Sequence, residues 1–219
     1  MARQLTLDLG HKPALGRADF LVTPANAGAV AMIERYPDWP HFGGVIVGPP
    51  GSGKSHLLEV WRAQAGALVV PAQDIASVPA DVFNAGGAIG IDDAPGDALD
   101  ERSLFHLLNL ARQSQGHVLI AATADPASWK VALPDLVTRL KALPVARVEA
   151  PDDALLRGVL VKLFADRQLA VEESVISYLM LRMPRALDAA RAIVAELDRL
   201  ALTEKSAISR ALAARVLEA

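Results

Sequence analysis

The stretch GPPGSGKS, Gly48–Ser55, decides the fold class, because it matches the pattern G-x-x-x-x-G-K-[ST] in full. An apolar run at Val45–Val47 precedes it and predicts a buried strand. Leu57, Leu58 and Trp61 follow it at the spacing of one helix face. A plain connecting loop can also be rich in Gly and Pro. Strand, loop and helix in this order are nevertheless the context that a phosphate-binding loop requires, and they favour that interpretation.

Each part of this loop has an expected role toward the phosphates of a nucleotide. The glycines let backbone N–H groups turn toward phosphate oxygens, and the start of the following helix adds its positive end. Lys54 is expected to reach the β- and γ-phosphates, and Ser55 to hold Mg²⁺. The expected nucleotide contacts in this segment are Gly48, Pro49, Pro50, Gly51, Ser52, Gly53, Lys54, Ser55 and His56.

Further short apolar runs read as buried strands, each bounded by Gly, Pro or Asp. With the first strand they are Val45–Val47, Ala67–Val70, Ala88–Ile91, Val118–Ala122 and Val145–Val148. Helical patterns lie between several of them, which predicts a parallel sheet covered on both faces. After Pro151 the pattern is helix upon helix, with Asp152 or Asp153 as a first cap, Pro184 beginning a third helix and Thr203 capping a last one.

Composition excludes several classes of protein. The 219 residues are 52% hydrophobic and 21% charged, as in an ordinary globular protein. The net charge of −3, with no clustered Lys or Arg, predicts no strong direct DNA binding. There are no cysteines, which excludes disulfides and thiolate metal sites. A polar N-terminus and the lack of a long apolar run predict no signal peptide and no membrane span, so we expect a cytoplasmic protein.

Polar residues at the ends of two predicted strands are further candidates. In AIGIDDA, Asp92 is suited to the magnesium shell and Asp93 to orienting an attacking water, although a strand-end acid can also serve a turn. In AATAD, Thr123 and Asp125 lie at the carboxyl edge of the sheet, where open α/β folds bind ligands. A role in sensing the γ-phosphate competes there with a plain turn before Pro126.

Two arginines can stabilise charge on a transferring phosphoryl group. Arg139 lies in PDLVTRLKALP, and Arg185 lies in the first turn of the predicted third helix of the C-terminal region. Their spacing alone does not separate this role from that of solvated surface residues.

Five segments, in the order GPPGSGKSHLL, IDDA, TAD, PDLVTRL and MPRALDAA, resemble the AAA+ module of the bacterial replication initiator DnaA. They resemble more particularly the shorter Hda-type members of that family, which inactivate the initiator. The resemblance covers about residues 18–217. It implies an α/β AAA+ P-loop NTPase core, a five-stranded parallel sheet with flanking helices, followed by a small all-helical lid domain.

The resemblance assigns roles to the matching positions. Lys54 and Ser55 take Walker A roles, Asp92 and Asp93 take Walker B roles, and Asp125 matches sensor I. These roles imply ADP or ATP with Mg²⁺ as the ligands, without deciding between the two nucleotides.

The same resemblance implies functional roles for the two arginines. Arg139 matches a finger that enters the ATP site of an adjoining subunit, and Arg185 matches the sensor II arginine of the lid. The segment DFLVTPAN, Asp19–Asn26, resembles the stretch that flanks adenine, and its candidate base contacts are Phe20, Leu21 and Val22.

The N-terminal stretch QLTLDL, Gln4–Leu9, resembles the hexapeptide with which Hda-type proteins dock on the sliding clamp, the β subunit of DNA polymerase III. In an extended peptide Leu5, Leu7 and Leu9 project to one side, and Gln4 offers a directional amide. A strand added to the sheet edge is the alternative, but Gly and Pro soon afterwards favour a tail. We therefore divide the chain into a flexible clamp-binding tail (1–12), a nucleotide-binding domain (13–150) and a helical lid (151–219).

The resemblance implies a negative regulator of replication initiation that binds the clamp and stimulates hydrolysis of DnaA-bound ATP through Arg139. Weak intrinsic ATPase activity is compatible with Asp93. Two alternatives stay open: a DnaC-type AAA+ helicase loader, and a non-catalytic adaptor tethered to the clamp. The initiator's DNA-binding helix-turn-helix has no counterpart before Ala219, so we expect no direct origin binding. The sequence also leaves open whether two copies form a homodimer.

Overall fold

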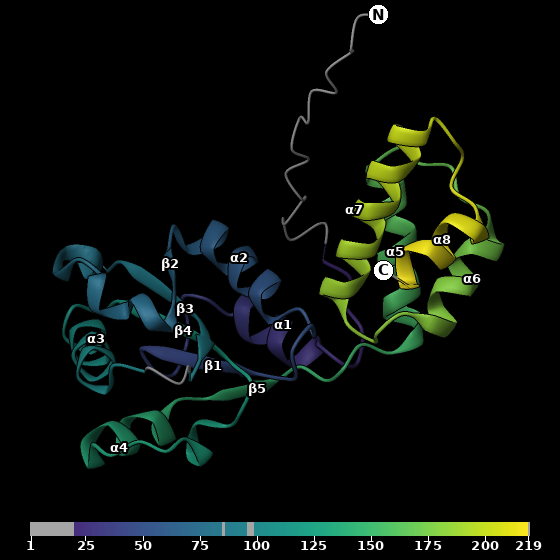
Figure 1. Ribbon diagram of the computed structural model, residues 1–219. Coiled ribbons are helices and arrows are strands. Elements are labelled where there is room, and N and C mark those ends of the chain that lie inside the picture. The colour runs from purple at the N-terminus through teal and green to yellow at the C-terminus, as the bar shows by residue number, and fades with distance from the viewer. Residues whose placement is uncertain (1–19, 85, 96–98, 219) are drawn as a thin grey trace, which may run out of the picture.

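The computed structural model describes residues 20–84, 86–95 and 99–218. The tail residues Gln4, Leu5, Leu7 and Leu9 lie outside these ranges, so the structure does not test the clamp-binding prediction. An α/β domain comes first in the chain, and a helical domain, the lid, follows it (Figure 1).

The sheet has five parallel strands, as the apolar runs predict, and their order is β2-β3-β4-β1-β5. The strands are β1 (Gly43–Val47), β2 (Leu68–Pro71), β3 (Ala88–Ala94), β4 (His117–Ala122) and β5 (Val145–Arg147). The chain leaves β1, forms β2 and β3 on one side, and returns through β4, which pairs with β1. Such a change of direction opens a crevice at the carboxyl ends of the strands.

Helices cover both faces of this sheet, so the central strands β1, β3 and β4 are buried on both sides, whereas the edge strands β2 and β5 are partly exposed. They are α1 (Ala27–Glu34), α2 (Lys54–Ala65), α3 (Glu101–Gln113) and α4 (Pro134–Ala142), with the short 3₁₀ turns η2 (Ala72–Ser77), η3 (Ala80–Phe83) and η4 (Pro126–Ser128). In β1, Ile46 joins the core beneath α1 and α2, whereas Val45 and Val47 join the core beneath α3 and α4. This alternation explains why the run reads as uniformly apolar.

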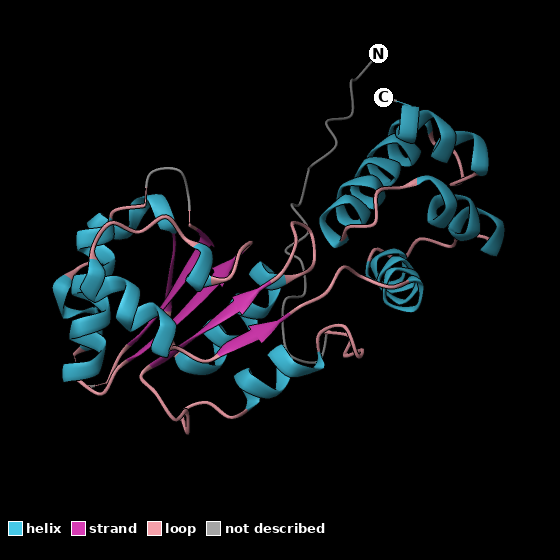
Figure 2. Cartoon of the chain, turned by 90° about the horizontal axis from the view of Figure 1, so that it is seen from below, coloured by secondary structure: helices cyan, strands magenta, loops and turns pink. Residues whose placement is uncertain are grey.

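The lid has its own apolar core. Its helices are α5 (Asp153–Asp166), α6 (Glu173–Arg182), α7 (Leu187–Glu204) and α8 (Arg210–Glu218). Leu160, Leu179 and Leu197 lie at its centre and are fully buried. In Figure 2 the arrowheads of the strands point toward the side on which the lid lies, so the crevice faces the lid.

Two predicted helix starts in the lid are wrong. Pro184 does not begin the third helix: Ala186 has an extended backbone (φ −145°, ψ 140°), and α7 begins only at Leu187. Thr203 does not cap a fourth helix. It lies inside α7, where its Oγ1 donates to the carbonyl of Arg199 at 2.7 Å, because the apolar face continues to Ala201. The first lid helix does begin as expected, with Asp152 accepting a hydrogen bond from the Leu155 amide.

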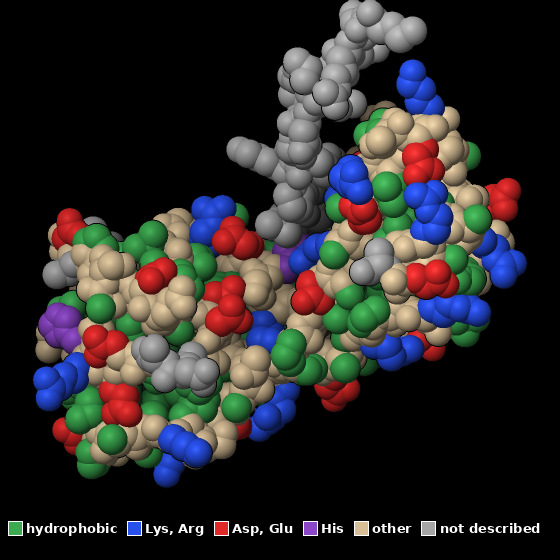
Figure 3. Space-filling model, viewed as in Figure 1, with side chains coloured by type: hydrophobic (Ala, Val, Ile, Leu, Met, Phe, Trp, Pro, Cys, Tyr) green, Lys and Arg blue, Asp and Glu red, His purple; other side chains and the backbone are tan. Residues whose placement is uncertain are grey.

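Charged side chains of both signs are distributed over the surface of the molecule. On the face shown in Figure 3, acidic and basic side chains are interspersed rather than gathered into a large area of one sign. Within the described ranges, no helix is both long and apolar enough to cross a bilayer.

Candidate functional site

The phosphate-binding loop joins the end of β1 to the start of α2. Gly51 (φ 69°) and Gly53 (φ 100°) have left-handed backbones, which glycine adopts without the steric cost that other residues incur. No side chain caps the start of α2, and its first turn carries no acidic residue. The backbone N–H groups at this helix end are therefore open to an anion.

Lys54 lies at the floor of this loop. Its side chain is buried, and its Nζ donates to the carbonyl of Pro49 at 2.8 Å. Burial lowers the pKa of Lys54, while Asp92, Asp93 and Asp188 act in the opposite direction. Because a buried ammonium gains most from an anionic partner, the phosphates of a nucleotide suit this position.

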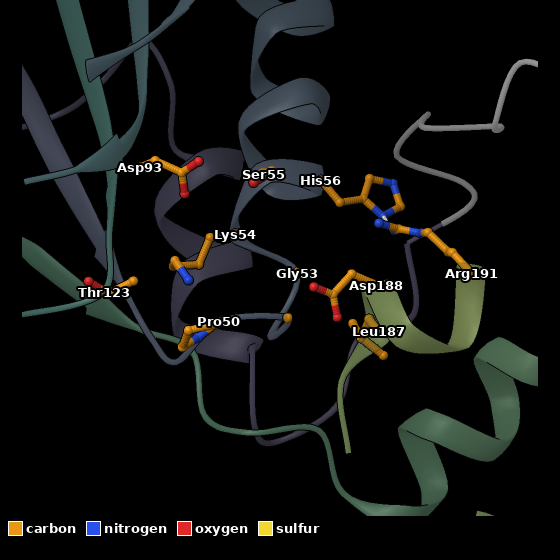
Figure 4. Close-up of a pocket in the computed structure, with 11 residues that line it drawn as sticks. Pro50, Gly53, Lys54, Ser55, His56, Asp93, Thr123, Leu187, Asp188 and Arg191 are labelled. Atoms are coloured by element: carbon orange, nitrogen blue, oxygen red, sulfur yellow. Dashed lines mark hydrogen bonds between the residues drawn. The ribbon is translucent and has the colours of Figure 1, made fainter. Parts of the chain in front are cut away.

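A cavity of about 300 Å³ opens beside Lys54 (Figure 4). It is enclosed by the phosphate-binding loop, by the ends of β3 and β4, and by the first turns of α7. Its lining residues are Pro50, Gly51, Gly53, Lys54, Ser55, His56, Asp93, Thr123, Leu187, Asp188 and Arg191. The two domains of the chain therefore share one site.

The acidic pair lies at the end of β3, as predicted. Asp93 has a left-handed backbone (φ 57°), and its amide donates to Asp92 Oδ1 at 3.0 Å. The β3–β4 register shifts between Ile91 and Ala94. Asp93 lines the cavity on the side opposite the lid, whereas Asp92 is half-buried and does not line it.

The structure separates the two candidates at the end of β4. Thr123 lines the cavity. Asp125 instead caps η4, accepting from the Ala127 amide at 3.0 Å and from Arg147 Nη2 at 2.7 Å. These two partners hold the pKa of Asp125 below its usual range. In this conformation Asp125 serves the turn, and a sensing role for it remains a prediction.

The two predicted arginines also lie outside the cavity lining. Arg185 is exposed and pairs with Asp153 of α5 at 2.7 Å. Arg139 lies on α4, with its guanidinium 5.4 Å from the ring centre of Phe105 in α3. Its Nε atom is buried without a hydrogen-bond partner among the described residues. A group in this position serves its own chain's cavity poorly, so the finger prediction concerns a neighbouring molecule.

The sequence did not indicate the lid residues that line the cavity. The Leu187 amide donates to the Gly51 carbonyl at 2.7 Å, and Arg191 Nη2 lies 2.9 Å from His56 Nδ1. Asp188 lies between these contacts on the first turn of α7. In the sequence Asp188 and Arg191 look like solvated polar positions on an amphipathic helix, and no local pattern distinguishes them from other such positions.

The segment expected at the adenine has a defined conformation. Asn26 is buried; its Oδ1 accepts from the Thr23 amide and its Nδ2 donates to the Leu21 carbonyl, both at 2.9 Å. Phe20 packs edge-on against His56, while Leu21 and Val22 are exposed. Leu21 lies close to Gly158 of α5, and none of the three side chains lines the cavity, so their contact with a base stays a prediction.

The residues present fit a magnesium nucleotide. Ser52 Oγ is buried without a hydrogen-bond partner in the described part of the chain, and Ser55 is exposed at the cavity. Among the described residues there is no cluster of three or more His, Asp or Glu side chains able to hold a metal alone. Mg²⁺ is commonly held by one or two protein oxygens together with phosphates, which is what Ser55 and Asp92 could supply.

No protein-family model and no curated protein sequence matches the chain. Solved structures do. Domain III of the replication initiation protein DnaA from Thermotoga maritima is 21% identical, with 94% of this chain and 97% of that chain covered and a TM-score of 0.80. AMPPCP-bound DnaA from Aquifex aeolicus is 18% identical, with coverages of 89% and 70% and a TM-score of 0.68.

The RuvB Holliday junction branch migration motor of Thermotoga maritima is also similar, at 16% identity, coverages of 89% and 66% and a TM-score of 0.64. At these identities the likeness concerns the fold. The chain has a DnaA-like fold, with a five-stranded parallel sheet, flanking helices and a helical C-terminal region.

Proposed function

We propose that this chain binds ADP or ATP with Mg²⁺ in the cavity beside Lys54. The observation that carries this proposal is the buried Lys54 ammonium at the open N-terminus of α2, inside a cavity that both domains line. The similar DnaA of Aquifex aeolicus was solved with AMPPCP, an adenine nucleotide analogue, which supports the same ligand class here.

Each residue has a role that follows from its position. The amides of the phosphate-binding loop and Lys54 bind the phosphates, exchanging the Pro49 carbonyl for phosphate oxygens as acceptor of the Lys54 ammonium. Ser55 and Asp92 would hold Mg²⁺, which neutralises phosphate charge when bound. Asp93 faces the cavity and can orient a water molecule, which would give a weak ATPase activity.

We further propose that the chain is an Hda-type negative regulator of replication initiation, which stimulates hydrolysis of DnaA-bound ATP. The position of Arg139 supports this: its guanidinium packs on Phe105 and its Nε lacks a partner among the described residues. A guanidinium held in this way, away from its own cavity, is suited to stabilising phosphoryl charge in a partner's site.

The partners in this proposal are DnaA and the sliding clamp, the β subunit of DNA polymerase III. Gln4, Leu5, Leu7 and Leu9 would dock on the clamp and bring the finger to the initiator near DNA. Because the clamp supplies the contact with DNA, the chain needs no strong DNA binding of its own. Whether it works as a homodimer is a separate question that sedimentation can answer.

A single-turnover assay tests this function. The decay of ATP bound to DnaA is followed with clamp loaded on DNA, in the presence of wild type, Arg139→Ala, or Gln4→Ala combined with Leu7→Ala. Lys141→Ala, an exposed cation on the same helix, is the matched control. We expect wild type and Lys141→Ala to accelerate hydrolysis of the DnaA-bound ATP equally. With Arg139→Ala the acceleration should be smaller than with wild type by a factor of at least about 100.

The other outcomes separate the alternatives. Full activity of Arg139→Ala would contradict the finger and favour an adaptor that only tethers proteins to the clamp. Binding to a replicative helicase, without any dependence on Gln4 or Leu7, would favour a helicase loader of the DnaC type.

A further inference from the structure

The contact between His56 and Arg191 links the phosphate-binding helix to the lid. His56 follows Ser55 on α2, and Arg191 lies on α7; Arg191 Nη2 is 2.9 Å from His56 Nδ1 (Figure 4). A guanidinium can only donate hydrogen bonds. His56 Nδ1 is therefore the acceptor, and the ring carries no proton on that nitrogen.

Arg191 is a cation in a place where cations are rarely left without an anion. Its side chain is half-buried and lines the cavity. Within the described ranges no carboxylate forms an ion pair with it, and Asp188 is the acidic residue that acts on its charge from the same helix. Burial lowers the pKa of Arg191. An anionic ligand in the cavity would relieve this desolvation.

The position of the pair along the cavity identifies which anion this is. Asp93 and Thr123 lie on one side of Lys54, and His56 with Arg191 on the other (Figure 4). The second side is also the side of Phe20, whose ring centre is 5.1 Å from that of His56. Lys54 suits the β- and γ-phosphates, and the Phe20 segment suits the base, so the phosphate between them, the α-phosphate, would lie near His56 and the Arg191 that contacts it.

We propose that Arg191 binds the α-phosphate of the nucleotide and that His56 is the positioning residue that aims it. This inference rests on the proposed nucleotide site and adds the lid residue that recognises its phosphate nearest the ribose. Binding at this phosphate draws α7 against α2, so the lid closes on any adenine nucleotide regardless of its γ-phosphate. Arg185, which pairs with Asp153, is not needed for this contact.

Calorimetric titrations with adenosine, AMP and ADP test the proposal, because these ligands differ by one phosphate at a time. In wild type we expect AMP to bind more tightly than adenosine. In Arg191→Gln we expect this AMP-to-adenosine ratio to fall by about 10- to 100-fold, with the ADP-to-AMP ratio unchanged. Lys54→Ala should do the reverse. His56→Phe, which keeps the ring but removes the acceptor, should lower the AMP-to-adenosine ratio to a smaller extent.

Arg199→Gln is the matched control, since Arg199 lies on the same helix and pairs with Glu196 away from the cavity. Circular dichroism establishes that each variant is folded, and Arg191→Met, which keeps the aliphatic stem, replaces Arg191→Gln if that variant is not. An unchanged AMP-to-adenosine ratio in a folded Arg191 variant that still binds ADP overturns the role of Arg191 alone. Failure of wild type to bind ADP overturns the nucleotide site itself.

Discussion

The α/β domain and the lid are each built around apolar cores of their own, whereas the contacts that join them at the cavity are polar. Leu108 is fully buried against the sheet, and Leu197 is fully buried among the lid helices. At the cavity, by contrast, the Leu187 amide meets the Gly51 carbonyl, and the His56 ring meets the Arg191 guanidinium.

This difference separates what stabilises the chain from what its ligand can control. Apolar cores supply most of the folding free energy and do not depend on a ligand. Polar contacts in a shared cavity contribute little by themselves and can be exchanged for contacts with a bound anion. The position of the lid should therefore respond to nucleotide, while the interior of each domain does not.

The largest expected effect comes from opening a cavity in either core. Leu108→Ala and Leu197→Ala should each cost about 2–5 kcal/mol, because both side chains are fully buried. The three tryptophans, Trp39, Trp61 and Trp129, all belong to the α/β domain, so their fluorescence reports that domain alone. In urea titrations Leu197→Ala should shift the circular dichroism transition and leave the fluorescence transition nearly unchanged.

Leu108→Ala should shift the fluorescence transition instead. If the two variants shifted both signals equally, the domains would unfold as one unit and the separation of their cores would have no thermodynamic meaning.

Gly51→Ala should have a smaller effect on the free energy of unfolding, and its structural effect should be confined to the contact between the phosphate-binding loop and the first turn of α7. An added Cβ would lie 2.5 Å from both Ala186 Cβ and Asp188 Oδ1, and φ is 69°. Gly66→Ala is the matched control, since its φ is 64° and nothing lies within 4 Å of its Cβ. The left-handed backbone costs each variant about 1–2 kcal/mol. Gly51→Ala alone should also speed hydrogen exchange at the first turn of α7, and equal exchange in both variants would show that the loop does not position the lid.

The pH dependence of the α/β domain should show a contribution from His117, which packs against Tyr36 and Trp39 with its Nδ1 buried and unpartnered within the described residues. Burial lowers the pKa of His117, and its hydrogen bond with the Pro37 backbone acts in the opposite direction. Below the unfolded pKa of about 6.5 the unfolded chain takes up a proton that the folded chain resists, so stability falls as pH falls.

Urea unfolding of wild type and His117→Phe at pH 7.5 and pH 5.5 measures this contribution. Wild type should lose more stability between the two pH values than His117→Phe does. Identical losses would remove His117 as their source.

The smallest expected effect is at the exposed pair of Arg147 and Asp125. Arg147→Ala should raise the pKa of Asp125 but leave it below its usual value, because the Ala127 amide, the larger cause, remains. Carbon-detected NMR titration of the Asp125 carboxyl measures this. A return to the ordinary pKa would mean that Arg147, and not the amide, controls the carboxylate.

The sequence predicts those features that depend on neighbouring residues. The loop Gly48–Ser55 is one continuous motif, and short apolar runs locate all five strands. The runs of the central strands β1, β3 and β4 are the clearest, because these strands are buried on both faces. The start of α7 at Leu187 was not predicted correctly, because Pro184 fits an extended turn as well as a first helical turn. Thr203 was wrongly predicted to cap a helix, because the apolar period of α7 continues past the point where that helix was expected to end.

The rest of the site depends on contacts between distant residues. Asp125 is held by Arg147, which is 22 residues away, and His56 meets Arg191 across 135 residues. Neither pair has a local signature, so the sequence indicates both Thr123 and Asp125, of which only Thr123 lines the cavity, and it indicates Arg185 where the structure places Arg191 at the cavity. Which polar side chain lines the cavity and which forms an ion pair elsewhere depends on the folded arrangement of these elements, which neighbouring residues in the sequence do not determine.

Hydrogen exchange with and without Mg²⁺–ADP tests most directly whether the cavity that the two domains share is the nucleotide site. We predict that the ligand slows exchange in two separate stretches, the phosphate-binding loop with the start of α2 and the first two turns of α7, and leaves the amides of the lid core unchanged. Slowed exchange in the loop without any change in α7, or no change in either stretch, would contradict the account.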